Sequence, residues 1–212
     1  MRKLINFTID KRLLLYLIIA FMFATIIGTL SHEYGHFFAA KLIGLDAKVH
    51  YAYVSYNCSD NFREFTAFDG LLLTMGGPLQ TILTGIIGLC LLFANKRKIL
   101  KMNKLDVKSW VYVFLSLFWL RQVANFAVWS IRSLISGKFS RGSDEIGLAM
   151  YFQLPEWSII AATALLGLMV AVFVIFKFIP INQRFTFILS GLIGGVSGYY
   201  LWLESIGKLI MP

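Results

Sequence analysis

Charged residues are scarce in this chain of 212 residues. Asp, Glu, Lys and Arg together make up 15% of it, against roughly 25% in an ordinary soluble domain. Apolar residues reach 58%, which is too much for one water-soluble core of this length. The composition therefore excludes a disordered chain and a nucleic-acid-binding domain of ordinary make-up. A multi-span membrane protein is the class that remains.

Cysteine is almost absent as well, with Cys58 in a polar segment and Cys90 in an apolar one. Two such residues form neither a disulfide framework nor a thiolate metal motif. Basic residues outnumber acidic ones by 20 to 11, yet they cluster between apolar runs. In that position they indicate membrane topology and contact with the anionic lipid of the bilayer, so we expect no nucleic-acid partner.

Five apolar runs have about the 17–25 residues that a transmembrane helix needs. The first exceeds the core of a signal peptide and has no cleavage site, so we expect a retained helix. The pattern predicts an α-helical multi-pass membrane protein with about five transmembrane helices. The predicted parts are a core over 1–155, with a first helix at 13–40, a β-type segment at 46–70, helices at 71–93 and 110–131 and an aspartate segment at 141–155, and two further helices within 156–212.

A stretch rich in β-branched and aromatic residues follows the first predicted helix, from Val49 to Tyr56. Such a stretch predicts a short strand or hairpin. Because a bilayer core does not accept open strand edges, the hairpin must be shielded by protein or lie in a wet cavity. We therefore expect a short membrane-associated β-hairpin.

The strongest chemical signal is the pentapeptide His32-Glu33-Tyr34-Gly35-His36. On a helix, residues four apart lie on the same face, so His32 and His36 can bind one Zn²⁺ together. Glu33 is placed to take a proton from a water molecule at the metal, which is the division of labour that peptide hydrolysis needs. A bound dication with access to water also offsets the cost of charged groups inside an apolar helix. The alternative is a polar cap at the helix end, with these side chains reaching for the membrane surface.

The segment from Thr29 to Lys41, TLSHEYGHFFAAK, resembles the metal-binding helix of the site-2 protease-like intramembrane zinc metalloproteases. The β-type segment is similar to that family's membrane-associated β-loop, and the GGPL stretch at 76–79 resembles the start of its next helix. The resemblance covers about residues 13–155. It implies one Zn²⁺ per chain and a membrane protein or peptide substrate that is cut in or near its transmembrane segment.

A zinc ion that keeps one position for water needs a third protein ligand. The family supplies an Asp from a later membrane helix, and the resemblance implies Asp144 here. Asp144 also precedes an apolar run, 146–154, that is long enough to dip into the bilayer. Glu145 is the second candidate for this ligand, and His50 is a weaker one because the strand would have to fold back onto the helix. A helix N-cap is the alternative role for Asp144.

Arg121 and Asn125 are four residues apart in the third predicted helix and therefore share a face. Polar groups at this depth usually face the interior of a helix bundle. We expect Asn125 to bind the substrate backbone or to steady the oxyanion, with hydrogen-bonded packing between helices as the alternative. Arg121 is expected to pair with an acid or a carbonyl.

Together these observations predict a zinc-dependent intramembrane endopeptidase in which His32, His36 and Asp144 hold zinc and Glu33 is the catalytic base. A catalytically inactive membrane adaptor that retains the fold and a metal-binding transporter are the alternatives; the intact H-E-x-x-H favours the enzyme. We expect an integral, multi-pass protein of the cell membrane. The distribution of basic residues places the N-terminus in the cytoplasm and zinc near the outer face, whereas the family resemblance implies zinc nearer the cytoplasm.

Overall fold

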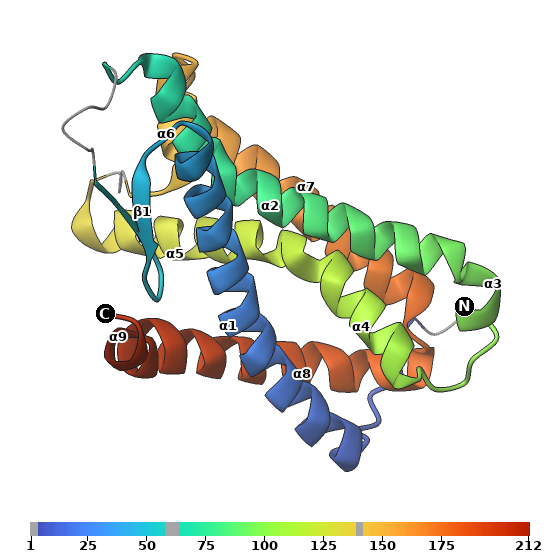
Figure 1. The fold of residues 1–212 in the computed structure, drawn as a ribbon. Helices are drawn as coiled ribbons and strands as arrows, with labels where there is room; N and C mark the ends of the chain where they lie inside the picture. The colour runs from blue at the N-terminus through green and yellow to red at the C-terminus, as the bar shows by residue number, and fades with distance from the viewer. Residues whose placement is uncertain (1–3, 58–63, 139–141) are drawn as a thin grey trace.

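A computed structural model describes residues 4–57, 64–138 and 142–212 of the chain (Figure 1). The fold is mostly helical, and five helical segments are long and apolar enough to cross a membrane. These segments are Lys11–Leu42, Ala67–Ala94, Val107–Ser136, Ser158–Phe178 and Ile181–Ile210. A two-stranded hairpin follows the first of them. The predicted fold class is therefore confirmed.

The first span is one continuous helix, α1 (Lys11–Leu42), which extends two residues beyond the predicted 13–40 at each end. Asp10 caps its first turn by accepting a hydrogen bond from the Leu13 amide at 3.2 Å, which satisfies a helix N–H that has no partner within the helix. The helix continues through the His-Glu-x-x-His segment without a break. This continuity keeps both histidines on one helix face.

The hairpin after α1 consists of β1 (Asp46–Val49) and β2 (Val54–Asn57), paired antiparallel. Its turn is held by the C-terminal helical segment, where the Trp202 indole N–H donates to the Tyr51 carbonyl at 2.8 Å. The Tyr51 amide in turn donates to the Met211 carbonyl at 3.0 Å. Protein therefore covers the turn of the hairpin, as expected for strands beside a bilayer.

The second span, α2 (Ala67–Ala94), begins inside the segment 46–70 that the residue pattern indicates as β-type, so that prediction is too long. The reason is a capping box. The Thr66 hydroxyl accepts from the Asp69 amide at 3.3 Å, and the Asp69 carboxylate accepts from the Thr66 amide at 2.9 Å. This local capping starts the helix, and Asp69 lies in its first turn rather than in a strand. Cys58 lies outside the described residues.

The third span contains two helices, α4 (Val107–Ser116) and α5 (Leu120–Ser136), joined by a single 3-10 turn, η1 (Leu117–Trp119). It is longer at both ends than the predicted helix at 110–131. The two helices meet at an angle in Figure 1, and a tight 3-10 turn inside a span is a common cause of such a change in direction. Gly137, with a φ of 65°, ends α5 in the left-handed conformation that glycine adopts without strain.

The C-terminal part begins with a short helix and continues with two spans. The predicted aspartate segment contains the short helix, and the last span includes seven residues of π-helix before its final turn. The elements are α6 (Asp144–Tyr151), α7 (Ser158–Phe178), α8 (Ile181–Tyr199), the π-helical η2 (Tyr200–Ile206) and α9 (Gly207–Ile210).

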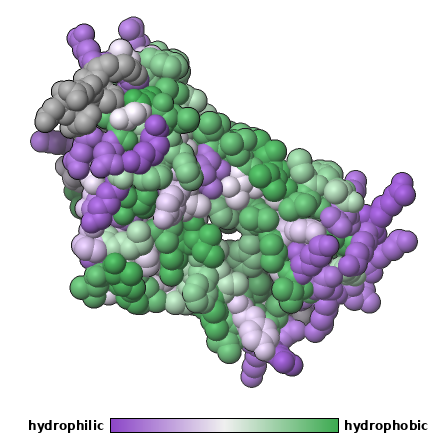
Figure 2. All heavy atoms as spheres, in the orientation of Figure 1, coloured by the Kyte–Doolittle hydropathy of each residue, from purple (hydrophilic) through white to green (hydrophobic). Residues whose placement is uncertain are grey.

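Basic side chains gather at one end of the molecule, around α3 (Lys96–Ile99) and the loop that follows it. Figure 2 shows this hydrophilic end on the right, a second group of hydrophilic side chains at the upper left, and a largely hydrophobic surface between the two. The buried apolar core lies in the same half, where α1, α2, α4, α7 and α8 meet, and includes Leu17, Phe21, Leu92, Val113, Val174, Phe178 and Phe187. The histidine pair lies in the opposite half, in the C-terminal part of α1.

α1 and α2 cross at a pair of glycines close to the histidines. A Cβ on Gly35 would lie 2.3 Å from the Gly76 carbonyl oxygen, and one on Gly76 would lie 2.5 Å from the Gly35 oxygen. Because neither residue has a side chain, the two backbones come into direct contact here. The crossing brings the next residue of α2, Gly77, against the imidazoles of α1.

Candidate metal centre

Two imidazoles of α1 lie together in the protein interior. His32 and His36 are 1% and 7% exposed, and their Nε2 atoms are 3.2 Å apart. The four-residue spacing on a helix accounts for this, because it places both side chains on one face. The paired arrangement expected from the sequence is therefore present.

The orientation of each imidazole is set by a hydrogen bond at Nδ1. His32 Nδ1 lies 3.0 Å from the Thr81 hydroxyl oxygen, and that hydroxyl donates to the Gly77 carbonyl at 3.1 Å. Thr81 therefore accepts from His32, so the proton of His32 is on Nδ1. His36 Nδ1 donates to the Leu73 carbonyl at 2.6 Å, a shorter contact than the 3.4 Å from the Gly77 amide to the same nitrogen. In this tautomer both Nε2 lone pairs point at the shared space, as in metal-binding histidines.

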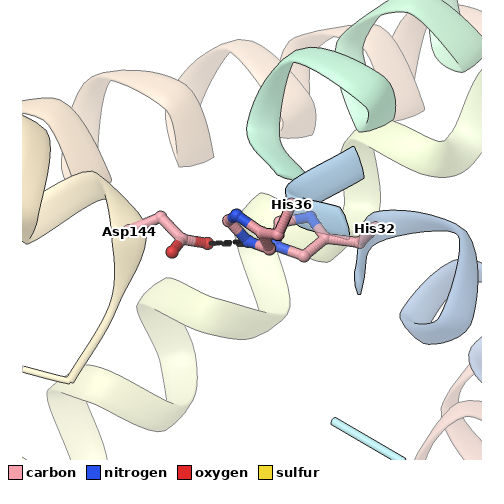
Figure 3. Close-up of side chains that lie close together, drawn as sticks. All are labelled: His32, His36 and Asp144. Atoms are coloured by element: carbon pink, nitrogen blue, oxygen red, sulfur yellow. Dashed lines mark hydrogen bonds and ion pairs between the residues drawn. The ribbon is translucent and has the colours of Figure 1, made fainter. Parts of the chain in front are cut away.

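Asp144 completes the group from the start of α6 (Figure 3). Its Oδ2 lies 2.9 Å from His32 Nε2 and 3.4 Å from His36 Nε2. Ser143, rather than Asp144, is the helix N-cap, since its hydroxyl accepts from the Ile146 amide at 3.4 Å. The capping role considered for Asp144 is thus taken by its neighbour, and Asp144 faces the imidazoles.

The spacing of these three atoms suits a small tetrahedral metal ion. Zinc bonds of 2.0–2.1 Å in tetrahedral geometry separate the ligand atoms by about 3.3–3.4 Å. The three observed separations, between 2.9 and 3.4 Å, are close to that value. Three electron-pair donors at such distances repel each other unless a proton or a cation lies between them. Among the described residues, His32, His36 and Asp144 form a group that can hold a metal ion.

Gly77 provides the clearance for this group. A Cβ on Gly77 would lie 2.3 Å from His36 Nε2 and 2.4 Å from His32 Nε2. Because Gly77 has no side chain, α2 can lie directly against both imidazoles without displacing the nitrogens that a metal ion would bind. The residues present therefore fit a bound zinc ion.

Charge in the surroundings also favours a dication. Three carboxylates belong to this region, on Glu33, Asp144 and Glu145, and Arg121 is the cation that faces them. Among these described groups the acids outnumber the cation, and a divalent ion offsets the excess negative charge. Burial would raise the pKa of the Asp144 carboxyl, but the two imidazoles outweigh burial and hold its pKa below the usual range. The Asp144 carboxyl group is therefore ionised at neutral pH.

Glu33 is buried beside the metal group and faces Arg121 of α5. It is 4% exposed, and its Oε1 lies 3.8 Å from Arg121 Nη2. The acid partner expected for Arg121 is thus Glu33. Tyr56 lies on β2, where it is paired with Ala47 of β1. Burial, together with the charges of Glu33 and Asp144, raises the pKa of the Tyr56 phenol to about 12, so its hydroxyl stays protonated at neutral pH.

The other candidates from the sequence lie away from the ligand atoms. Glu145, the second candidate for the third ligand, points to α5, where Asn125 Nδ2 donates to its Oε1 at 3.4 Å. Its burial raises the pKa of the Glu145 carboxyl. His50, the weaker candidate, contacts the Ser55 hydroxyl at 2.9 Å and stacks on Tyr53. Asn125 has a partner within the protein, and its role in substrate binding stays a prediction.

Three parts of the site are missed by reasoning from the sequence: the Nδ1 partners Thr81 and Leu73, the clearance at Gly77, and Tyr56. The Gly-Gly-Pro stretch marks where α2 comes close, but nothing in the sequence pairs it with the histidines. The Leu73 contact is made by a backbone carbonyl, which every residue carries. No local pattern therefore indicates it.

The site thus consists of a His-His-Asp group with an adjacent buried glutamate, held between α1, α2, α5 and α6. Compared with protein-family models, curated proteins and solved structures, the chain matches none. What the site can do is therefore argued from its own residues and their geometry.

Proposed function

We propose that this chain is a zinc-dependent intramembrane endopeptidase, similar in mechanism to the site-2 protease-like metalloproteases. The observation that carries the proposal is the convergence of His32, His36 and Asp144, with Glu33 next to the pair, inside a protein with five apolar spans. A structural polar cap needs no third ligand atom from a helix more than a hundred residues away. A metal-dependent hydrolase needs each of these parts.

His32, His36 and Asp144 would hold the ion, because two imidazoles and a carboxylate form a ligand set that zinc accepts in hydrolases. Zinc, when bound, supplies a Lewis acid that polarises a carbonyl and acidifies water. Thr81 and the Leu73 carbonyl keep the imidazoles in the ligating tautomer. Such outer hydrogen bonds orient the ligands and raise their basicity.

Glu33 would act as the general base and later as the general acid. Its carboxylate accepts a proton from the attacking water as the water oxygen bonds to the peptide carbon. When the carbon–nitrogen bond breaks, Glu33 returns that proton to the leaving amine. Arg121, 3.8 Å away, keeps this carboxylate oriented and offsets its charge.

The hairpin supplies a surface for an extended substrate. A transmembrane helix buries its carbonyls in hydrogen bonds, so it must unwind before one of them can be attacked. Among the described residues, β2 pairs with one strand neighbour, β1, so a substrate strand would add to the edge of β2 that has no strand partner. The charges of Glu33 and Asp144 act on the Tyr56 phenol of β2. A substrate strand on β2 would therefore run beside the metal group.

The test is the substitution Glu33→Gln, which keeps the shape of the side chain and removes the base. The variant should retain zinc and lose turnover by about 10²–10⁴-fold, the usual contribution of a positioned proton-transfer group. Zinc content and cleavage are measured on purified protein in liposomes, with single-span membrane peptides carrying a fluorophore and a quencher. Glu204→Gln, the same change at an exposed pair with Lys208, is the matched control.

A zinc-loaded Glu33→Gln protein that cuts at the wild-type rate would end this mechanism. Wild-type protein that binds zinc and cuts none of the peptides, while still binding them, would favour the inactive adaptor. Zinc uptake across the liposome membrane without any cleavage would favour the transporter. The three functions thus give different combinations of the same measurements.

A further inference from the structure

The position of Asp144 depends on a short helix. α6 spans only eight residues, Asp144–Tyr151, and packs against α2 and α7. Gly147 of α6 is in close contact with α2, where its Cβ would lie 3.2 Å from the Thr74 methyl. Asp144 is the first residue of this helix, so a small rotation of α6 would carry its carboxylate away from the imidazoles of α1.

The residue after Asp144 is more deeply buried than the ligand itself. Glu145 is 1% exposed, whereas the Asp144 side chain is 29% exposed. The helix dipole stabilises a carboxylate in the first turn of a helix, but this stabilisation does not require the carboxylate to be buried. Burial of such a group is unfavourable unless the group is hydrogen-bonded. Asn125 of α5 donates a hydrogen bond to Glu145 Oε1 at 3.4 Å, in addition to the local hydrogen bonds from the Ser143 side chain and the Glu145 backbone.

α5 therefore makes two similar contacts at the metal centre. Each contact is to the residue that follows a proposed ligand in the sequence. Arg121 faces Glu33, which follows His32, and Asn125, one turn further along α5, donates to Glu145, which follows Asp144. Through these contacts, α5 connects the end of α1 that carries the histidines with the start of α6 that carries Asp144.

We propose that Asn125 is a positioning residue of the metal centre, which holds Asp144 against the two imidazoles by means of its hydrogen bond to Glu145. This inference rests on the proposed zinc site. Without the amide, the buried Glu145 carboxylate loses its donor from α5, keeps only the local donors of α6, and turns toward water. Because Glu145 and Asp144 are adjacent in the chain, that movement displaces the ligand.

The experiment measures zinc affinity by competition with a chelator, on full-length protein in detergent. Asn125→Leu removes the amide at similar size, and Glu145→Leu removes the acceptor. Each should lower zinc affinity by about 10–100-fold, the usual effect of losing an outer partner of a ligand. The double variant should be no worse than either single variant, because both changes remove the same hydrogen bond.

Glu145→Gln separates position from charge. The glutamine carbonyl still accepts from Asn125, so this variant should bind zinc almost as well as the wild type. Gln122→Leu is the matched control on α5: the side chain is 1% exposed, and neither of its polar atoms has a hydrogen-bond partner among the described residues. Its zinc affinity should be unchanged.

A second readout reports the ligand set directly. With Co²⁺ in place of zinc, the visible d–d spectrum of both Leu variants should change in the same way, as expected if Asp144 leaves the metal. Thermal unfolding of the metal-free proteins checks that each variant is folded. If Asn125→Leu does not fold, Asn125→Ser, which is too short to reach Glu145, takes its place in every measurement.

Unchanged zinc affinity and an unchanged Co²⁺ spectrum in Asn125→Leu would overturn the inference while leaving the metal centre intact. Equal losses in Glu145→Leu and Glu145→Gln would also overturn it, since Glu145 would then act through its charge. Wild-type protein that binds no zinc would instead overturn the proposed function itself, and this inference with it.

Discussion

The substitution Gly77→Ala gives the sharpest test of the metal centre, because it changes no ligand. The added methyl carbon would lie 2.3 Å from His36 Nε2, 2.4 Å from His32 Nε2 and 2.6 Å from His32 Cδ2. A zinc ion held by the same nitrogens would lie 2.0–2.1 Å from each. The methyl group would overlap both imidazoles, so the two ligand nitrogens must move away from the positions that they share with the metal.

The displacement can be worked out from these distances. Ordinary contacts of a Cβ begin at 3.4 Å, so imidazoles that start at 2.3 Å must retreat by about 1 Å. Zinc sites tolerate deviations of about 0.2 Å in their ligand distances. Loss of an outer hydrogen-bond partner of a ligand lowers metal affinity by about 10–100-fold. A shift of the ligand nitrogens several times larger than the tolerated deviation should lower zinc affinity by more than that.

The same change should leave the protein folded. Overpacking of an interior costs about 1–3 kcal/mol, and replacing glycine by alanine in a helix returns up to about 1 kcal/mol. The assay compares zinc content and chelator competition with thermal unfolding in detergent. Gly28→Ala, one turn before His32, is the control, since its Cβ would meet nothing within 4 Å. A Gly77→Ala protein with wild-type zinc affinity would refute the location of the site.

Two further predictions concern the third ligand and the hairpin. Asp144→Asn should lower zinc affinity by more than Glu145→Gln and should abolish cleavage. The control is Asp46→Asn, a change at an exposed aspartate paired with Lys41. A larger loss of zinc affinity in Glu145→Gln than in Asp144→Asn would show that Glu145 is the ligand. Trp202→Phe removes the indole N–H that binds the Tyr51 carbonyl at 2.8 Å and keeps an aromatic ring, so hydrogen exchange in the hairpin, 46–57, should accelerate while zinc binding is retained. Trp157→Phe, at an exposed position, should change neither, and equal exchange rates in both variants would contradict the anchoring role.

Much of the architecture follows from local sequence. Five apolar runs of sufficient length predict five spans because a bilayer imposes a fixed thickness on every helix that crosses it. The four-residue interval between His32 and His36 places two imidazoles on one helix face, whatever surrounds them. Errors occur where two local signals compete. The residue pattern predicts a β-type segment up to residue 70, but the capping pair Thr66 and Asp69 starts α2 at Ala67.

The tertiary structure alone decided which distant groups join the histidines. Asp144 is 112 positions from His32, and no periodicity connects residues at that separation; only the resemblance to a family and the apolar run after it singled out this aspartate. The same holds for Gly77, whose missing side chain matters because α2 crosses α1 at Gly35 and Gly76. Asn125, predicted to bind the substrate backbone or to steady the oxyanion, also donates to Glu145 of α6, a contact that no sequence pattern indicates. Local spacing thus determined the histidine pair and the spans, whereas helix crossings determined which carboxylate joins the pair, the close approach of α2 at Gly77 and the partners that orient the imidazoles.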